Sequence, residues 1–187
     1  MQIRAAIAAD LALLAEIDGT VESTRYLHLE RAGEGLAAAW RLEERPLRQK
    51  LIEPNRLPDE TAFLVKQIVT GADEGLVLVA EYDDDIIALA IAQERPAVST
   101  LHVHDLRIDY DLRRQGLGTA LLYQVIAHAR EREGVRAVSA ETLTNNDPAN
   151  HLLAKCGFEL SGVDTRRNSN HDVVKEAATL LWYAPLD

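Results

Sequence analysis

The residues best suited to chemistry form a short basic segment that contains two glycines, Arg113-Arg114-Gln115-Gly116-Leu117-Gly118-Thr119. It follows an expected strand over residues 101–108 and opens a strongly helical run. Glycines let the backbone approach an anion closely, and the first amides of a helix direct their N–H groups and the positive dipole end at it. The arginines add charge-assisted hydrogen bonds. The segment therefore predicts a phosphate-binding site.

The segment matches neither of the two common nucleotide motifs. It has no Gly-x-x-x-x-Gly-Lys-Ser/Thr pattern and no Gly-x-Gly-x-x-Gly pattern. The simpler alternative is a glycine-rich turn that precedes an ordinary amphipathic helix.

Two histidines on the preceding strand are candidates for proton transfer. His102 and His104 alternate, so both imidazoles are expected on one face of the strand, and Asp105 on the opposite face. A histidine with a pKa of about 6.5 can accept a proton near neutrality. The structural alternative is packing against a helix or pairing with surface acids. Two histidines without a third ligand do not indicate a metal, and none is expected.

These residues must be positioned by strands that alternate with helices. We expect strands at residues 2–4, 76–82, 86–93, 101–108, 135–142, 158–161 and 179–183. Helices are expected at residues 8–17, 58–71, 117–134 and 148–155. Residues 22–53 are left open: 24–29 fits a strand, and 36–42 fits a strand or a helix. This order predicts an α/β fold with a mixed sheet.

Composition limits the classes of protein to consider. The 187 residues, 47% hydrophobic, suit one domain over 1–187. A net charge of −10 argues against a nucleic-acid or anionic-membrane partner and favours a cationic one. No stretch approaches the length of a membrane span, and the first residues lack the apolar core of a signal peptide, so we expect a cytoplasmic location. The single cysteine, Cys156, excludes an internal disulfide and a cysteine-rich zinc site.

The basic segment resembles the Arg/Gln-x-x-Gly-x-Gly/Ala loop of the GNAT N-acetyltransferase superfamily, which holds the pyrophosphate of acetyl coenzyme A. The resemblance extends from about Leu76 onward, and its C-terminal part is most similar to streptothricin acetyltransferases. Those enzymes acetylate an amine of a cationic antibiotic. The matching residues are Glu141-Thr142, Asn145-Asn146, Ala149, Lys155-Cys156-Gly157-Phe158, Gly162-Val163-Asp164-Thr165 and Trp182-Tyr183.

The resemblance implies a mostly antiparallel mixed sheet, flanked by helices, with a splayed central strand pair. It implies acetyl coenzyme A as co-substrate, with pantetheine along the backbone of the splayed strand and Arg107 beside the ligand or in solvent. N–H groups beside the thioester could also stabilise an oxyanion. The implied cofactor-binding residues are Leu106, Arg107, Ile108, Arg113, Arg114, Gln115, Gly116, Leu117, Gly118, Thr119, Asn145 and Asn146.

The resemblance also implies catalytic roles. The two histidines resemble a pair in arylalkylamine N-acetyltransferases, and His104 stands where related enzymes tend to carry a glutamate. His104 is therefore the expected base, assisted by His102. Leu153 departs from the family, which commonly has a tyrosine there to protonate the coenzyme A thiolate. The sequence does not choose among solvent and the possible substitutes Cys156, Tyr110, Tyr123 and Tyr183.

The resulting hypothesis is an acetyl-coenzyme-A-dependent N-acetyltransferase that acts on a small cationic amine, with antibiotic resistance as its context. The candidate residues for holding the acceptor are Asp105, Glu141, Asp164 and Glu176. The alternatives are acetylation of a protein α-amine or lysine, and a non-catalytic module that binds or senses acyl coenzyme A. The oligomeric state is open between a monomer and a homodimer.

Overall fold

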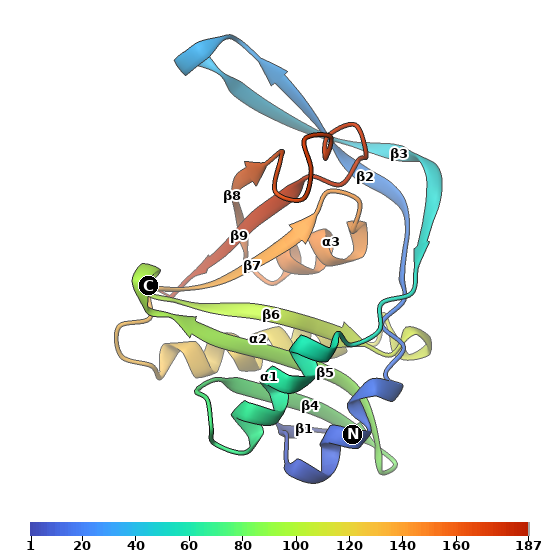
Figure 1. Cartoon of the computed structure of the whole chain (residues 1–187), viewed down its shortest axis with the longest axis vertical. Helices are drawn as coiled ribbons and strands as arrows, with labels where there is room; N and C mark the ends of the chain where they lie inside the picture. Colours follow the sequence, from blue (N-terminus) through green and yellow to red (C-terminus); the bar gives the residue numbers. More distant parts are fainter. Residues whose placement is uncertain (187) are drawn as a thin grey trace.

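A seven-stranded mixed sheet forms the centre of the computed structural model, which describes residues 1–186 (Figure 1). Asp187, the last residue of the predicted domain, lies outside the described residues. The strand order is β1-β4-β5-β6-β7-β9-β8, and β2 and β3 pair separately. The strands are β1 (Gln2–Ala5), β2 (Val21–Ala32), β3 (Ala39–Glu53), β4 (Leu76–Tyr82), β5 (Asp85–Arg95), β6 (Thr100–Ile108), β7 (Ala137–Leu143), β8 (Glu159–Asp164) and β9 (Thr179–Pro185).

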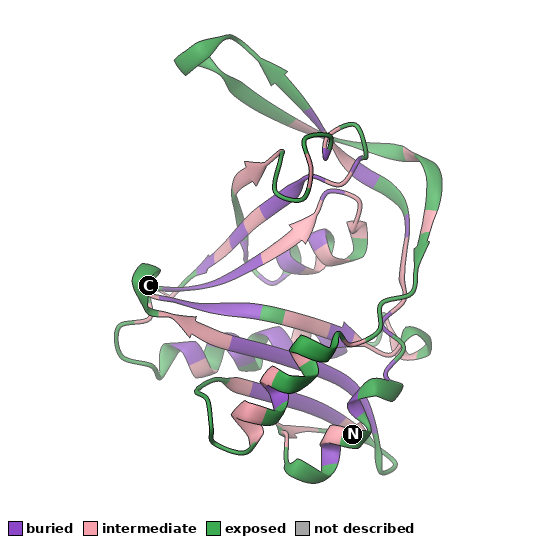
Figure 2. Ribbon diagram, in the orientation of Figure 1, coloured by how far each residue is buried: buried purple, intermediate pink, exposed green. Residues whose placement is uncertain are grey.

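Helices cover the sheet on both sides. They are α1 (Asp59–Val69), α2 (Leu117–Arg130) and α3 (Asp147–Lys155). The stripe predicted for α2 is buried against the alanine-rich side of β4 and β5, while α1 packs on the opposite face of these strands (Figure 2). No helix within residues 1–186 is both long and apolar enough to cross a membrane.

The central strands β6 and β7 form a fork. They are the parallel neighbours in an otherwise antiparallel sheet, and they pair only from Thr100↔Ala137 to Val103↔Ala140. Beyond those residues the strands diverge, as Figure 1 shows. The predicted mostly antiparallel fold with a splayed strand pair is confirmed.

A β-bulge at His104 changes which residues of β6 share a face. Val103 is opposite Ala92 of β5, but Asp105 is opposite Ile91, so His104 is an extra residue. Ile91 belongs to the cluster under α1. Asp105 therefore lies on the same face as His102, and the expectation that it lies opposite is wrong because a bulge shifts the alternation by one residue.

The segment predicted as one helix over residues 8–17 forms two short 3-10 helices, η1 (Ala8–Ala12) and η2 (Leu14–Glu16). Asp10 accounts for the difference. Its carboxylate accepts a hydrogen bond from the Ile7 N–H at 2.8 Å and pairs with Arg4 at 2.7 Å. These local bonds favour a tight turn over a continuous helix.

The open region 22–53 forms a long antiparallel hairpin, which we call the arm, made of β2 and β3. A 3-10 turn, η3 (Gly35–Ala37), connects the two strands. Gly33 has φ +77°, and a Cβ there would lie 2.3 Å from the Ala37 carbonyl oxygen, so the turn requires glycine. The arm is attached to the body by the buried Tyr26 and Leu29 and by a 3.0 Å bond from the Leu27 N–H to the Thr144 carbonyl. Its tip projects away from the sheets (Figure 1).

Candidate active site

A cleft of about 1080 Å³ occupies the fork between β6 and β7. Its walls are the first residues of β2, the N-terminal turn of α2, the side of α3, and part of the loop between β8 and β9. Histidine, carboxylate, arginine and free backbone groups thus meet in one space, which opens where the two parallel strands part.

The two glycines at the start of α2 have different roles. Gly116 has φ +87°, and a Cβ built on it would meet no atom within 4 Å, so it requires glycine for its backbone conformation and faces open space. At Gly118 a Cβ would lie 2.8 Å from Leu152 Cδ2, so this glycine permits close packing of α2 on α3. The first N–H groups of a helix have no partner within the helix. An anion can therefore reach them at Gly116.

The two arginines of this segment are not equivalent. The Arg113 guanidinium donates to the carbonyls of Ile108 at 3.1 Å and Thr20 at 2.5 Å, and it lies over the Tyr110 ring at 5.1 Å. Arg113 therefore anchors the loop. Arg114 is exposed with φ +63°, and none of residues 1–186 forms a hydrogen bond with its side chain. Arg114 is the arginine that is available to a phosphate.

The backbone of β6 beyond the bulge faces the fork at alternate residues. The Asp109 N–H donates to the Ile87 carbonyl at 2.9 Å, on the β5 side. Since backbone groups alternate along a strand, Leu106 and Ile108 direct theirs into the fork. Both line the cleft, and their role in holding a pantetheine chain stays a prediction.

Arg107 lines the cleft, and its side chain is held by neighbouring residues and is not in solvent. Its side chain is 2% exposed, donates to the Asn55 carbonyl at 2.8 Å, and pairs with Asp105 at 2.6 Å. The bulge places both residues on the α1 face, where they neutralise each other. Asp105 is therefore committed to Arg107.

The two histidines lie at different depths. His102 is buried, its Nδ1 is 3.0 Å from Ser139 Oγ, and it is absent from the lining of the cleft. Burial, and to a smaller extent the positive charge of Arg95, lower the pKa of His102 to about 3. His102 is thus neutral near physiological pH. It cannot itself serve as a base that titrates near neutrality.

His104 lines the cleft and packs edge-on against His102, with ring centroids 5.2 Å apart. Partial burial and the charge of Arg95 lower the pKa of His104, against the opposing effect of Glu141 and Asp105. The imidazole is therefore neutral at pH 7 and able to accept a proton.

Glu141 stands across the fork from His104. The last paired residues are Val103 and Ala140, so His104 and Glu141 are the next residue on each strand. Glu141 Oε2 is 2.7 Å from Arg167 Nη2, and its Oε1 is 3.5 Å from Arg95 Nη1. A carboxylate and an imidazole thus flank the point where the cleft opens.

The other two carboxylates proposed to hold the acceptor lie elsewhere. Asp164 accepts a hydrogen bond from the Arg166 N–H at 3.0 Å and stabilises a turn. Glu176 pairs with Arg48 of the arm at 3.2 Å. Neither lines the cleft. Of the four predicted residues, Asp105 and Glu141 line the cleft, but Asp105 is paired with the buried Arg107. Glu141 is therefore the one of the four that lies beside His104 and has no buried arginine as its partner.

Leu153 is buried and lines the cleft, so the wall is apolar where the family commonly has a tyrosine. Among the predicted substitutes, Cys156 is buried, and this burial raises the pKa of its thiol. Tyr123 is exposed on α2, and Tyr183 lies under Arg136. Tyr110 does line the cleft, beside Arg113 at the phosphate end, and its hydroxyl donates to Glu22.

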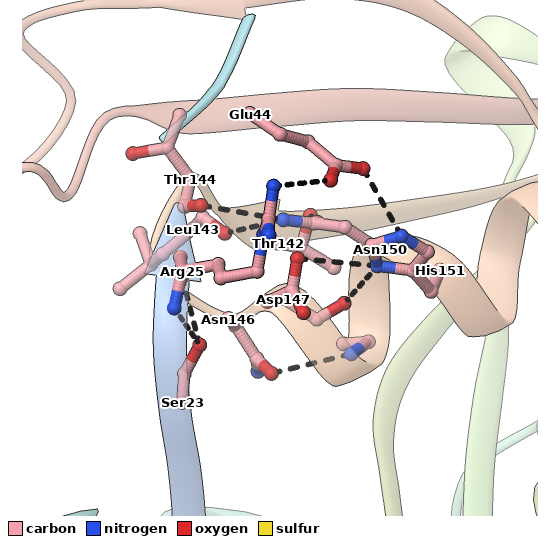
Figure 3. A network of polar contacts seen from close by, with 11 residues as sticks. Ser23, Arg25, Glu44, Thr142, Leu143, Thr144, Asn146, Asp147, Asn150 and His151 are labelled. Carbon is pink, nitrogen blue, oxygen red and sulfur yellow. Dashed lines mark hydrogen bonds and ion pairs between the residues drawn. The ribbon is translucent and has the colours of Figure 1, made fainter. Parts of the chain in front are cut away.

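Sequence reasoning missed Asn150, a buried residue that holds α3 in place. Its amide donates to the Leu143 carbonyl at 3.1 Å, and its oxygen accepts from Thr142 Oγ1 at 2.5 Å (Figure 3). Asn146, predicted as a cofactor residue, caps α3 by accepting from the Ala149 N–H at 3.3 Å and also lines the cleft. Asn145 and Gln115 are outside the lining. Asn150 lies one turn before the apolar Leu153 on the same helix. A polar residue at that spacing on a buried face was the signal that could have identified it.

His151 connects α3 to the arm through two carboxylates. Its Nε2 is 3.1 Å from Glu44 of β3, and its Nδ1 is 3.2 Å from Asp147, one turn earlier on α3. Arg25 of β2 pairs with the same Glu44 at 3.2 Å (Figure 3). The Asp147 carbonyl and the charges of Asp147 and Glu44 raise the pKa of His151.

We expect the arm to loosen as pH rises. A histidine whose folded pKa is raised contributes stability that is complete below its unfolded pKa and is lost as pH passes the folded value. Hydrogen exchange of arm amides, corrected for intrinsic rates, should show less protection at about pH 8.5 than at about pH 6. His151→Gln should abolish that difference. Equal changes in both proteins would show that His151 does not connect arm and body in this way.

The chain is similar in sequence to known proteins. Residues 36–158 match the model of the acetyltransferase (GNAT) family. Over 81 residues the chain is 36% identical to Streptothricin acetyltransferase A of Bacillus subtilis (strain 168), which covers 43% of the chain. That match spans 46% of the relative, about half its length.

Two solved structures share the fold over the whole chain. The crystal structure of a nourseothricin acetyltransferase superposes with a TM-score of 0.77 at 23% identity, covering 100% of this chain and 98% of that one. An acetyl coenzyme A complex of a Bacillus anthracis str. Ames protein, assigned as a streptothricin acetyltransferase, gives 0.80 at 19% identity, covering 100% and 97%.

Proposed function

The chain belongs to the acetyltransferase (GNAT) family, and on that premise we propose that it transfers the acetyl group of acetyl coenzyme A to a primary amine of a small cationic acceptor. One observation carries the proposal: a single cleft joins a helix N-terminus suited to an anion, a strand with free backbone groups, and a neutral histidine. These are the three elements that the reaction needs, in the order in which an extended thioester would meet them.

The residues present fit acetyl coenzyme A. Arg114 and the N–H groups at Gly116 would bind its pyrophosphate. The fork-facing backbone of Leu106 and the Ile108 N–H would bind its pantetheine arm, since the Ile108 carbonyl already accepts from Arg113. When bound, the co-substrate supplies an electrophilic thioester carbonyl. The adjacent N–H groups of β6 would stabilise negative charge on that carbonyl oxygen, at about 3 kcal/mol per donor.

His104 would accept the proton of the attacking ammonium. It lines the cleft at the fork, and its lowered pKa keeps it unprotonated at pH 7. His102 packs against it and is held by Ser139. We assign His102 the role of positioning His104. The buried Leu153 supplies no proton, so we infer that the departing thiolate takes its proton from solvent.

A turnover assay tests the proposal. Coenzyme A release should depend on acetyl coenzyme A and on an added amine, and a panel should include streptothricin-like compounds, simple alkylamines, and peptides with a free α-amine or lysine. We expect release with the small cationic amines. Preference for the peptides would indicate a protein acetyltransferase. Tight acetyl coenzyme A binding without release across the panel would indicate a sensing module and overturn the proposal.

The acidic net charge of −10 supports a cationic acceptor. The names of the similar proteins, streptothricin and nourseothricin acetyltransferases, support an antibiotic as that acceptor. A single domain over residues 1–187 and a cytoplasmic location stay predictions, as does the choice between a monomer and a homodimer. Sedimentation of the purified chain would decide the last of these.

A further inference from the structure

The loop between β8 and β9 presents one arginine to the cleft. On one side of Arg167, the Arg166 N–H donates to Asp164 at 3.0 Å. On the other side, the Asn168 N–H donates to Asp172 at 2.9 Å, and Ser169 Oγ donates to the same carboxylate at 2.7 Å. These turns hold the loop so that Arg167 reaches Glu141 and lines the cleft.

The ion pair of Arg167 with Glu141 differs from the other pair beside the fork. Arg107, the partner of Asp105, is buried and also bonded to Asn55, so it cannot leave without exposing two acceptors. The Arg167 side chain is 48% exposed, and the pair with Glu141 is its one polar contact among residues 1–186. An exposed pair of this kind contributes little to stability and breaks readily.

Glu141 is also the carboxylate that an acceptor would meet first. It faces the same side as His104, on the neighbouring strand, at the first residue past the paired segment. Its second cation, Arg95, is at 3.5 Å, which is a weak contact. If Arg167 moved away, Glu141 would keep only that contact and would offer an open oxygen beside the reacting amine.

We propose that Arg167 occupies the position of a second cationic group of the acceptor, and that a dicationic amine displaces it and binds Glu141 while its other amine lies beside His104. This inference rests on the proposed function and defines its substrate class. It makes Glu141 a specificity-determining residue, and it makes Arg167 an internal competitor of the acceptor. Part of the preference for cationic acceptors then comes from the replacement of Arg167 by the second ammonium group at Glu141.

The experiment compares 1,5-diaminopentane with 1-aminopentane, which differ only in the second charge. Calorimetry with the coenzyme A complex measures both dissociation constants. We expect the diamine to bind more tightly than the monoamine. Glu141→Gln should weaken the diamine about tenfold or more and leave the monoamine nearly unchanged, because a charge-assisted hydrogen bond is lost.

Arg167→Ala should have the opposite effect. Without the competing guanidinium, the diamine should bind about two- to fivefold more tightly, the gain expected from removing an exposed ion pair. Arg166→Ala is the matched control, since it removes the same charge from the neighbouring, exposed position. Glu159→Gln, an exposed residue outside the cleft, is the control for the carboxylate.

The proposal is overturned if the diamine has no advantage, if neither amine binds, or if Glu141→Gln leaves the advantage intact. Equal effects of Arg166→Ala and Arg167→Ala would also overturn it, because general electrostatics would then explain the change. Failure of the proposed function looks different: no amine of the turnover panel would release coenzyme A. Turnover with an unaltered diamine preference in Glu141→Gln would contradict the inference alone.

Discussion

Replacing His104 with alanine is expected to reduce turnover by about 10² to 10⁴-fold, while acetyl coenzyme A binds with nearly unchanged affinity. His104 is the neutral imidazole that lines the fork, and it is separate from the phosphate end of the cleft. The variant removes the proton acceptor but no residue of the proposed cofactor site. Steady-state turnover and calorimetric titration with acetyl coenzyme A measure the two effects separately.

The pH profile carries the same expectation. Because the pKa of His104 is lowered from 6.5, turnover in the natural protein should rise with pH through an ionisation below that value and reach a plateau near neutrality. His104→Gln, which keeps a polar side chain, should lose this rise. Profiles for two amines of different basicity complete the test. An inflection that follows the amine and persists in the glutamine variant would mean that His104 is not the base.

The second large effect is expected from Gly116→Val. Gly116 has φ +87°, which a β-branched residue adopts only under strain, and its missing side chain leaves open the space beside the α2 amides. Valine would fill that space and distort the turn. Affinity for acetyl coenzyme A should fall at least about tenfold.

Gly71→Val provides the matched control for this strain. Gly71 has φ +75° with no atom within 4 Å of a built Cβ, and it follows α1, away from the cleft. Both variants should lose similar stability in thermal unfolding, but only Gly116→Val should lose acetyl coenzyme A. An unchanged dissociation constant in folded Gly116→Val would remove the phosphate-binding assignment.

Periodicity was sufficient to predict the main elements. The stripe from Leu117 to Ala129 on α2 and the hairpin of β4 and β5 follow directly from the spacing of apolar residues. The bulge at His104 could not be read in the same way. A bulge is a property of two strands and their register, whereas alternation within one strand carries no information about its partner. Asp105 was therefore expected on the wrong face.

The partners of charged side chains were the second feature that the sequence did not predict. Arg113 and Arg114 are adjacent and chemically identical, yet Arg113 donates to three backbone carbonyls, whereas the Arg114 side chain forms no hydrogen bond with the described residues 1–186. Glu176 pairs with Arg48, which is far away in the sequence, and Asp164 is bonded within a local turn. Motif spacing located the phosphate segment because its contacts are local. The acceptor side is built from β6, β7 and the loop between β8 and β9, and no single spacing describes it.

His104 is the one residue of β6 that the core could lose without changing the pattern of its faces. Without it, Val103 would be followed directly by Asp105, and inward and outward residues would still alternate from Thr100 to Ile108. Deleting a residue farther from the bulge, such as Leu101 or Arg107, would instead move the residues between it and the bulge to the opposite face of the sheet, His102 and Val103 in the first case and Asp105 and Leu106 in the second. The proposed base therefore occupies a position at which the strand can lose one residue and still pair correctly. Deleting His104 should abolish catalysis but leave the protein folded.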